Sequence, residues 1–460
     1  MTDTVKIISP VDGSVYAERV LATGIDIETA LIRAQMARRA WGETTLPERQ
    51  KIVSHMVDAL LLMNDAIVPE LAWQMGRPIR YGGEKRGVEE RSRYMIDLAT
   101  SALAPAQLPP KEGFSRYITR EPLGIVLVIA PWNYPFLTAV NSIVPALVAG
   151  NAVMLKHASQ TLLAGERFAL AADQAGLPAG LFQNLVMGHA DTEALMGSGQ
   201  IDHVNFTGSV EGGRRVEKAA AGTFATLGLE LGGKDPAYVR ADADIANAIE
   251  NLVDGSFFNS GQSCCGVERI YVHGDVYDRF VEGFLDTASG WTLGNPLEPE
   301  TMVGPMARGS FADHVRQQTE EAVRGGASAR LNLRHRLDVP GSPYLSPEVL
   351  TGVNHQMSVM REESFGPVVG IMKVADDAEA ITLMNDSPYG LTASIWTADL
   401  DMAGKLGAQV ETGTVFANRC DYLDPALVWT GVKDTGKGGS LSEIGYANLT
   451  QPKSYHLKQV

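Results

Sequence analysis

The fold is decided by residues 123–157, which read LGIVLVIAPWNYPFLTAVNSIVPALVAGNAVMLKH. A strand-length apolar run ends at Ala130, a stretch with helical periodicity follows, and a second apolar run begins after Gly150 and Asn151. Glycine and asparagine commonly stand where a helix ends. Since the order strand, helix, strand needs a crossover connection, the two strands should lie parallel in one sheet.

The same alternation extends on both sides of this segment. Strand-like and helical runs follow one another up to about residue 231, while residues 28–100 have helical, amphipathic periodicity and residues 115–122 alternate like a strand outside the main sheet. From Gly232 a second alternation begins, with helices expected at 245–258, 311–324 and 378–385 and strands at 269–273, 368–374 and 413–418. We therefore predict an α/β protein of two lobes, and a cleft between two such lobes is typical of cofactor-dependent enzymes.

The composition is that of an ordinary globular chain. Its 460 residues are 45% hydrophobic and 20% charged, which places them far from disordered sequences. The formal net charge is -15, and no run of basic residues could follow a phosphate backbone. This balance argues against a nucleic-acid partner.

The chain also lacks the signals of a membrane or secreted protein. No apolar run approaches the ~20 residues that a membrane-spanning helix needs. The first residues, MTDTVKIISPVDG, carry neither the basic nor the apolar region of a secretion signal. We therefore expect a cytoplasmic protein with free thiols at its three cysteines, Cys264, Cys265 and Cys420.

The most informative thiol is Cys264, in the segment FFNSGQSCCGVER at 257–269. It follows a predicted helix and a glycine turn that lets backbone N–H groups approach the sulfur, a setting that suits a nucleophile. The alternative is that Cys264 and Cys265 are small buried hydrophobic residues. A metal site is not expected, because no further ligands stand at zinc-site spacings, and no histidine signature of a thiol protease is present.

Glu230 is the candidate base for that thiol. It ends a predicted strand in LGLELGGKDP at 227–236, between Leu229 and Leu231, whose apolar setting would raise the pKa of its carboxyl. The alternative is a capping or salt-bridged glutamate at a strand end.

A cofactor site is suggested by FTGSVEGG at 206–213, where a strand runs into a helix. Free N–H groups at the helix start, with Gly208 and Ser209, could hold a pyrophosphate. The same residues also suit an ordinary helix N-cap, and the chain has no GxGxxG fingerprint.

Seven motifs in order give the chain a clear resemblance. They are PWNYP (131–135), LKHASQT (155–161), FTGS (206–209), LELGGK (229–234), GQSC (261–264), EESFGP (362–367) and the strand that ends at Asn418. Together they resemble the aldehyde dehydrogenase superfamily over nearly the whole chain. The resemblance implies a Rossmann-like cofactor domain (1–104 and 123–231), a catalytic domain (232–432) and a small β oligomerisation element (105–122 and 446–460). It also implies a homodimer or homotetramer.

The resemblance assigns roles to residues by motif position. Cys264 would be the nucleophile, Glu230 the general base and Asn133 the side-chain donor to the oxyanion. NAD or NADP would be bound by a set of residues at the remaining motifs: Lys156, Ser159, Gly208, Ser209, Glu363, Phe365, Trp132 and Leu231. Because members that transfer the acyl group to coenzyme A generally lack a base at position 230, hydrolysis to the free acid is expected.

The cofactor motif departs from the pattern of NAD-selective members at Ser159. These members usually carry a glutamate there, which repels a 2'-phosphate. A neutral serine removes the repulsion, so NADP should be tolerated, with Lys156 or His157 as the partner of its phosphate.

The substrate positions point to an aldehyde of low polarity. Eight residues after Asn133, where succinate-semialdehyde enzymes tend to carry an arginine, this chain has Asn141. The other tunnel positions would be Tyr134, Phe258, Leu423 and Trp429, a set that favours an apolar or aromatic aldehyde. Three alternatives remain open: a semialdehyde dehydrogenase, a thiol esterase or acyltransferase, and a binding protein on a retired enzyme scaffold.

Overall fold

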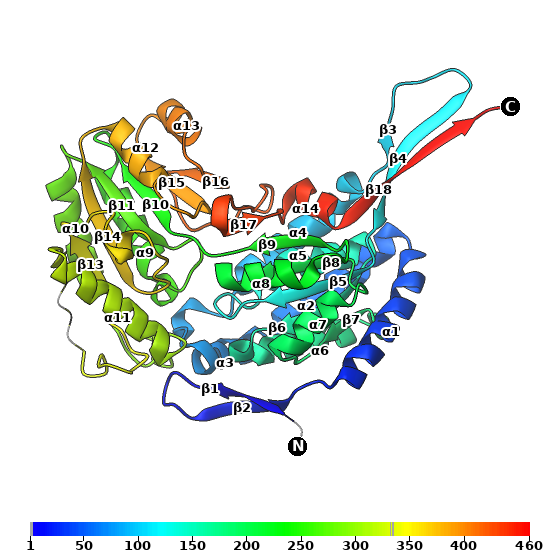
Figure 1. The fold of residues 1–460 in the computed structure, drawn as a ribbon, viewed down its shortest axis with the longest axis horizontal. Helices are drawn as coiled ribbons and strands as arrows, with labels where there is room; N and C mark the ends of the chain where they lie inside the picture. Colours follow the sequence, from blue (N-terminus) through cyan, green and yellow to red (C-terminus); the bar gives the residue numbers. More distant parts are fainter. Residues whose placement is uncertain (1–2, 332, 334) are drawn as a thin grey trace.

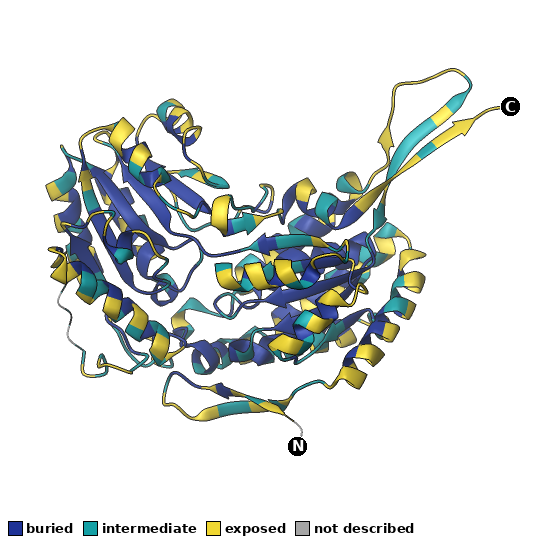
Figure 2. Ribbon diagram, viewed as in Figure 1, coloured by how far each residue is buried: buried dark blue, intermediate teal, exposed yellow. Residues whose placement is uncertain are grey.

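The computed structural model describes residues 3–331, 333 and 335–460. Figure 1 shows two lobes, each built around its own sheet, and an arm that projects from one of them and carries the C-terminus. Figure 2 shows that the strands inside both lobes are buried, whereas the arm is largely exposed. The α/β class and the two-lobed arrangement expected from the sequence are therefore confirmed.

The cofactor lobe holds a six-stranded sheet in the order β17-β9-β8-β5-β6-β7. All pairs are parallel except β17 with β9. The bounds of its strands are β5 (Ile125–Ala130), β6 (Ala152–His157), β7 (Phe182–Asn184), β8 (His203–Thr207), β9 (Thr226–Glu230) and β17 (Gly436–Lys437). Every residue of β5 and β6 is buried, as a parallel sheet covered on both faces requires.

Helices cover this sheet. The helix that crosses from β5 to β6 is α5 (Leu137–Ala149), which ends at Gly150 with φ of 104°, a left-handed conformation that glycine adopts readily. Around it lie α1 (Gly24–Gly42), α2 (Leu46–Leu62), α3 (Asn64–Met75), α4 (Lys85–Ala102), α6 (Leu162–Gln174), α7 (His189–Gly197), α8 (Val210–Ala220) and α14 (Ser442–Asn448). Within the described residues no single helix has the length and hydropathy of a membrane span. The helices α2 and α3 meet both criteria only when they are taken together, and the chain bends by 64° between them.

The second lobe holds a seven-stranded sheet in the order β12-β13-β14-β11-β10-β15-β16. Its strands are β10 (Asp235–Val239), β11 (Val267–His273), β12 (Ser328–Ala329), β13 (Glu348–Thr351), β14 (Val368–Val374), β15 (Thr392–Trp396) and β16 (Thr414–Ala417). Its helices are α9 (Ile245–Phe257), α10 (Tyr277–Ser289), α11 (Gly309–Arg324), α12 (Asp377–Asn385) and α13 (Leu400–Gly407). The helices and strands predicted here lie within two residues of the observed ones.

Alternate residues of the second sheet face two different hydrophobic cores. In β10, Ala237 and Val239 belong to one core and Tyr238 to the other. Because successive side chains of a strand point to opposite faces, the sheet is packed on both sides and gives the loops at its edge a rigid support.

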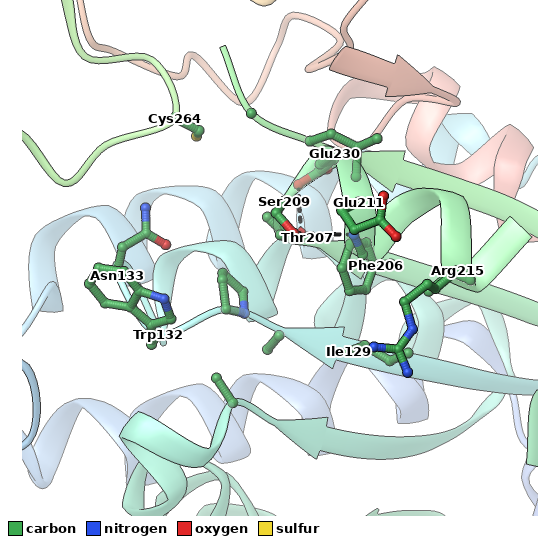
Figure 3. A pocket seen from close by; sticks show the side chains of 18 of the residues that line it. Ile129, Trp132, Asn133, Phe206, Thr207, Ser209, Glu211, Arg215, Glu230 and Cys264 are labelled. Atoms are coloured by element: carbon green, nitrogen blue, oxygen red, sulfur yellow. Dashed lines mark hydrogen bonds between the residues drawn. The ribbon is translucent and has the colours of Figure 1, made fainter. Parts of the chain in front are cut away.

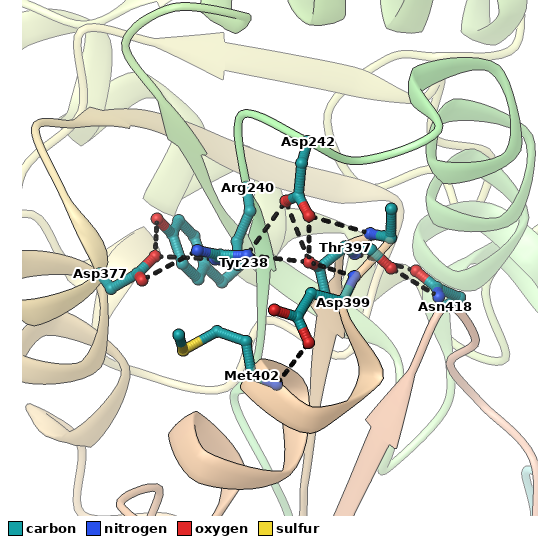
Figure 4. Close-up of polar contacts among 9 residues, drawn as sticks. Tyr238, Arg240, Asp242, Asp377, Thr397, Asp399, Met402 and Asn418 are labelled. Carbon is teal, nitrogen blue, oxygen red and sulfur yellow. Dashed lines mark hydrogen bonds and ion pairs between the residues drawn. The ribbon is translucent and has the colours of Figure 1, made fainter.

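The edge near Asn418 is fixed by a network of polar side chains (Figure 4). Arg240 pairs with Asp377 at 2.9 Å and with Asp242 at 3.1 Å. Asn418 accepts a bond from the N–H of Thr397 at 3.0 Å and donates to its carbonyl at 2.9 Å. These two bonds hold Asn418 at φ of 54°, a conformation that asparagine tolerates better than most residues.

The arm is a three-stranded antiparallel sheet in the order β18-β4-β3. It consists of β3 (Ala106–Gln107), β4 (Phe114–Pro122) and β18 (Thr450–Lys458), and it confirms the strand that was expected outside the main sheet. A further hairpin, β1 (Thr4–Ile8) with β2 (Val15–Val20), was not predicted, because its residues are mostly exposed and have no apolar alternation.

Candidate active site

A cavity of about 590 Å³ lies at the carboxyl ends of the parallel strands of the cofactor lobe and extends to the second lobe (Figure 3). This is the place where open α/β sheets bind ligands. The cavity brings together most of the predicted site residues, which come from segments far apart in sequence: Trp132, Asn133, Lys156, Gly208, Ser209, Glu230, Leu231, Cys264, Glu363 and Phe365.

Cys264 stands on a tightly folded loop between α9 and β11. Asn259 and Ser260 have positive φ angles of 53° and 59°, and Gly261 has 69°. A Cβ atom at Gly261 would lie 2.3 Å from the carbonyl oxygen of Gly366, so only glycine fits. The thiol is partly exposed and faces the cavity, as a nucleophile requires.

Asn133 is buried and held on both sides. Its Nδ2 donates to the carbonyl oxygen of Gln262 at 3.2 Å, which leaves the second amide hydrogen for a ligand. The backbone carbonyl oxygen of Asn133 accepts from Arg77 at 2.5 Å and from the Asn259 side chain at 3.2 Å. The side chain is therefore fixed before an aldehyde arrives, as an oxyanion donor should be.

Arg77 and Glu84 form the support behind Asn133. They make an ion pair at 2.5 Å in which both side chains are almost fully buried. Glu84 also accepts from the N–H groups of Phe136 and Leu137, at 3.0 and 2.6 Å, and so caps the start of α5. Carboxylates are favoured there because the first N–H groups of a helix have no partners within it.

Glu230 ends β9, as predicted, and its carboxyl is held by two hydroxyl groups. Thr207 Oγ1 donates to Oε2 at 3.0 Å and Ser440 Oγ donates to Oε1 at 2.5 Å. Burial of the carboxyl raises its pKa, and the two hydroxyl donors and the charge of Arg91 oppose that rise. A raised pKa is the property that a carboxylate base needs near neutral pH.

The other end of the cavity has groups that fit a dinucleotide. Ser209 caps α8 by accepting from the N–H of Gly212 at 3.1 Å, so the predicted N-cap and the predicted anion site coincide. Lys156 is buried and makes no hydrogen bond to the described residues, and desolvation lowers the pKa of its ammonium group. Such an unpartnered cation next to a helix start suits an anionic, hydroxyl-rich ligand.

Glu363 reaches the same cavity from the second lobe. It accepts from the N–H of Gly233 at 3.0 Å, and a Cβ atom at Gly232 would lie 2.3 Å from its Oε2, so glycine is needed for the carboxyl to reach this place. Desolvation, and secondarily the charge of Glu268, raise the pKa of Glu363 to about 8. Trp132 lies 5.6 Å, ring to ring, from Phe365.

Two residues of the 2'-phosphate prediction lie elsewhere. The first is Ser159, which begins a short 3-10 helix and does not line the cavity, whereas its neighbour Ala158 does. The second is His157. The suggestion that His157 could hold a phosphate is wrong: its Nε2 contacts the carbonyl oxygen of Pro135 at 3.1 Å and its Nδ1 contacts Thr161 at 3.3 Å. Burial also lowers the pKa of His157 to about 4, so the ring is neutral and fully engaged.

The residues proposed for the substrate tunnel lie outside the lining of this cavity. Tyr134 packs under the guanidinium of Arg77 at 4.8 Å, and Phe258 lies 4.5 Å, ring to ring, from Tyr81. Trp429 is buried and exchanges two 2.9 Å backbone hydrogen bonds with Ser440. The apolar substrate box therefore stays a prediction.

Asn141 and Leu423 also lie away from this cavity. Asn141 is buried within α5. Leu423 packs against the core of the cofactor lobe.

Cys265 has a specific polar contact that its sequence did not indicate. Its thiol donates to Asp421 Oδ1 at 2.8 Å. The contact with Cys264, followed by burial, raises the pKa of the Cys265 thiol, so it stays protonated beside the nucleophile. Among the described residues no group of three or more histidine, cysteine or acidic side chains could hold a metal.

The fold and this cavity fit a nicotinamide-dependent oxidoreductase, and the comparisons give its family. The chain matches the Aldehyde dehydrogenase family over residues 1–455 and belongs to that family. It is an NAD(P)-dependent aldehyde dehydrogenase.

Curated relatives and solved structures are similar over nearly the whole chain. An aldehyde dehydrogenase of Paenarthrobacter nicotinovorans is 35% identical, covering 97% of this chain and 98% of its own. A succinate-semialdehyde dehydrogenase [NADP(+)] of Deinococcus radiodurans is 32% identical, covering 97% and 93%. The structure of PnpE in complex with nicotinamide adenine dinucleotide superposes with a TM-score of 0.94 at 28% identity, covering 99% and 94%.

Proposed function

We propose that the enzyme oxidises an aldehyde to the free carboxylic acid through a covalent intermediate on Cys264. The observation that carries this proposal is that Cys264, Asn133 and Glu230, from three separate segments, line the same cavity as Lys156 and Glu363. A nucleophile, an oxyanion donor and a base are thus next to groups that would hold the two riboses and the pyrophosphate.

The steps follow from these positions. The Cys264 thiolate adds to the aldehyde carbon, and the oxygen that becomes negative is bound by the free amide hydrogen of Asn133. NAD(P)+, held by Lys156, Ser209 and Glu363, would supply the hydride acceptor for that carbon, and Cys264 would then carry the acyl group as a thioester. Glu230 then takes a proton from water as the water attacks the thioester, the acid leaves with the Cys264 thiolate restored, and Glu230 passes its proton to solvent.

Several finer assignments belong to this proposal. Residues 1–104 and 123–231 form the cofactor domain, 232–432 the catalytic domain, and 105–122 with 446–460 the oligomerisation element of a homodimer or homotetramer. The unpartnered Lys156 in the cavity supports acceptance of NADP as well as NAD, and Ser159, although outside the lining, adds no carboxylate that would repel a 2'-phosphate. The free cysteines of the described residues agree with the cytoplasmic location proposed here.

The test is the appearance of reduced nicotinamide with an aldehyde panel, for the wild type and for Cys264→Ala and Glu230→Gln. We expect no turnover for Cys264→Ala. Glu230→Gln should keep a first burst of reduced cofactor, about one equivalent for each subunit, while steady turnover falls by about 10²–10⁴-fold, because only the hydrolysis needs the base.

A different outcome would favour another function. Turnover of esters without either cofactor, lost in Cys264→Ala, would support a thiol esterase or acyltransferase. Cofactor binding without turnover of any aldehyde would support the retired scaffold.

A further inference from the structure

Lys234 and Glu268 form a buried ion pair that the catalytic steps above do not use. Nζ of Lys234 lies 2.5 Å from Oε2 of Glu268, and both side chains are almost fully buried. Lys234 stands four residues after Glu230, and Glu268 stands four residues after Cys264. Because burying two charges costs free energy that their attraction barely recovers, the pair is better explained by what it holds than by stability.

The pair holds the backbone of residues 363–365. Glu268 accepts from the N–H of Ser364 through Oε2 and from the N–H of Phe365 through Oε1, each at 2.9 Å. Lys234 donates to the hydroxyl of Ser364 at 3.0 Å. Ser364 is buried, so loss of the Glu268 carboxylate would leave its N–H without this acceptor in a place that water does not reach.

Ser364 is thus an anchor between two residues of the cofactor cavity, Glu363 and Phe365. Phe365 has φ of 50°, a left-handed conformation that a bulky residue adopts only where its surroundings support it. The bond from its own N–H to Glu268 supplies that support. The ion pair therefore fixes the backbone conformation from which Glu363 and Phe365 reach the cavity.

The same pair joins this segment to the segments of the nucleophile and the base. The carboxyl of Glu363 accepts from the N–H of Gly233, the residue before Lys234, at 3.0 Å. A Cβ atom at Gly233 would lie 2.5 Å from the carbonyl oxygen of Cys264, so the two backbones are in close contact. The segments that carry the base, the thiol and the cofactor contacts thus meet around one ion pair.

We propose that Lys234 and Glu268 are positioning residues that hold residues 363–365 in the conformation that binds the cofactor. Both lie outside the lining of the cavity, so they act on the cofactor only through this segment. The inference rests on the proposed aldehyde oxidation with NAD(P)+ and adds two residues to the machinery of cofactor binding.

The two charges of the pair also act on the carboxyl of Glu363, in opposite directions. The charge of Glu268 raises the pKa of Glu363, and the smaller influence of Lys234 lowers it. Because ionised Glu363 accepts better from ribose hydroxyls, the pH at which the Kd of the cofactor levels off follows this pKa. The other polar and charged groups beside Glu363 or in its cavity stay the same in every variant of the pair: the N–H of Gly233, Tyr389, Glu362 and Lys156.

The experiment is calorimetric titration with NAD+ and with NADP+, without aldehyde, from pH 5 to pH 10. For Glu268→Gln and for Lys234→Met we expect the Kd on the plateau at high pH to rise about tenfold or more, because the segment loses a bond that anchors it. The plateau should begin at lower pH than in the wild type for Glu268→Gln and at higher pH for Lys234→Met. A merely structural role would weaken binding equally at every pH.

The double variant Glu268→Gln with Lys234→Met keeps the test independent of folding defects, because no unpaired charge stays buried. It should bind the cofactor more weakly than the wild type, with a plateau that begins at lower pH, since Glu268 has the larger influence. Glu18→Gln, which breaks an exposed 3.8 Å pair with Lys6, is the matched control and should match the wild type.

Two results would overturn the positioning role: wild-type affinity in the double variant, or plateaus that move in the same direction in the two single variants. A wild type that binds the cofactor with the expected pattern and oxidises no aldehyde would instead overturn the proposed reaction and leave the positioning role standing.

Discussion

The carboxyl of Glu230 is subject to opposing influences, and one of them can be removed separately. Burial raises its pKa, while the hydroxyl of Ser440, 2.5 Å away, donates to the ionised form and lowers it. We expect Ser440→Ala to raise the pKa further. Since only ionised Glu230 acts as a base, the acidic limb of the kcat profile should move to higher pH, with about a tenfold rate change for each pH unit on that limb.

The measurement is steady-state kcat from pH 5 to pH 9, together with the burst amplitude, which should not change. Ser442→Ala, two positions along, is the control, because its hydroxyl bonds the N–H of Ile444 and not Glu230. If the acidic limb of the kcat–pH profile is at the same pH in Ser440→Ala and in the wild type, a group other than Glu230 determines its position.

The raised pKa of Glu363 predicts that cofactor binding depends on pH. Its pKa is raised to about 8, so the free protein carries a protonated carboxyl at neutral pH. Ribose hydroxyls donate better to the ionised form, so binding should release a proton below pH 8. The Kd of NAD(P)+ should therefore fall about tenfold for each pH unit as the pH rises toward 8, and level off above it.

Calorimetry in buffers of different ionisation enthalpy measures both the Kd and the proton released. Glu363→Gln should bind without this pH dependence, whereas Glu362→Gln, at an exposed neighbouring position, should keep it. A wild-type Kd that stays constant from pH 6 to pH 9 would contradict the assignment.

At the scale of elements, the buried ion pair of Arg77 and Glu84 joins the start of α5 to the loop of Cys264. Arg77→Met would leave Glu84 charged and unpaired in the interior, which costs about 3–5 kcal/mol of unfolding free energy. It would also free the carbonyl of Asn133, so kcat should fall as well. Adding Glu84→Gln should restore most of the stability and not the activity.

Urea unfolding followed by circular dichroism gives the stability, and initial rates give kcat. Arg80→Met is the matched control, because Arg80 has no carboxylate partner among the described residues: it makes an exposed 3.3 Å bond to a backbone carbonyl and lies over the Tyr81 ring at 5.8 Å. If the unfolding free energy of Arg77→Met lies within about 1 kcal/mol of the wild-type value, leaving Glu84 without Arg77 costs little, and the prediction is wrong.

The contrast between these residues shows what the sequence can predict. Cys264, Glu230 and Ser209 lie in local motifs in which the turn, the strand end and the helix start are themselves encoded by neighbouring residues. Arg77 lies in the loop after α3 and Arg91 in the middle of α4, and their partners Asn259 and Asn141 are 182 and 50 positions away. Neither a loop sequence nor an amphipathic helix distinguishes a cation that faces solvent from one that is buried, so only the folded structure shows that Arg77 and Arg91 are buried.

At the scale of the whole molecule, the arm is a sheet with an unpaired edge. β18 pairs with β4 through nine residues, yet most of its side chains are exposed. The N–H of Gln459 donates to the carbonyl of Gly113 at 2.8 Å, and hydrogen-bonded pairs alternate along an antiparallel ladder. The N–H groups of Ser454 and His456 therefore point away from β4, on the side where Pro452 has none.

An open edge of this kind is suited to pairing with another chain, which agrees with the proposed oligomerisation element. Replacing Ser454 and His456 with proline removes the outward donors, together with the contact of the His456 ring with Phe114 at 4.8 Å, which the double alanine variant also removes. An edge strand tolerates proline at these positions, so the subunit should stay folded. We expect the wild type to sediment as a dimer or tetramer. The double proline variant should sediment as a smaller species and bind the cofactor as the wild type does. The double alanine variant at the same positions should match the wild type. Equal masses for the wild type and the proline variant would mean that this edge makes no contact between subunits.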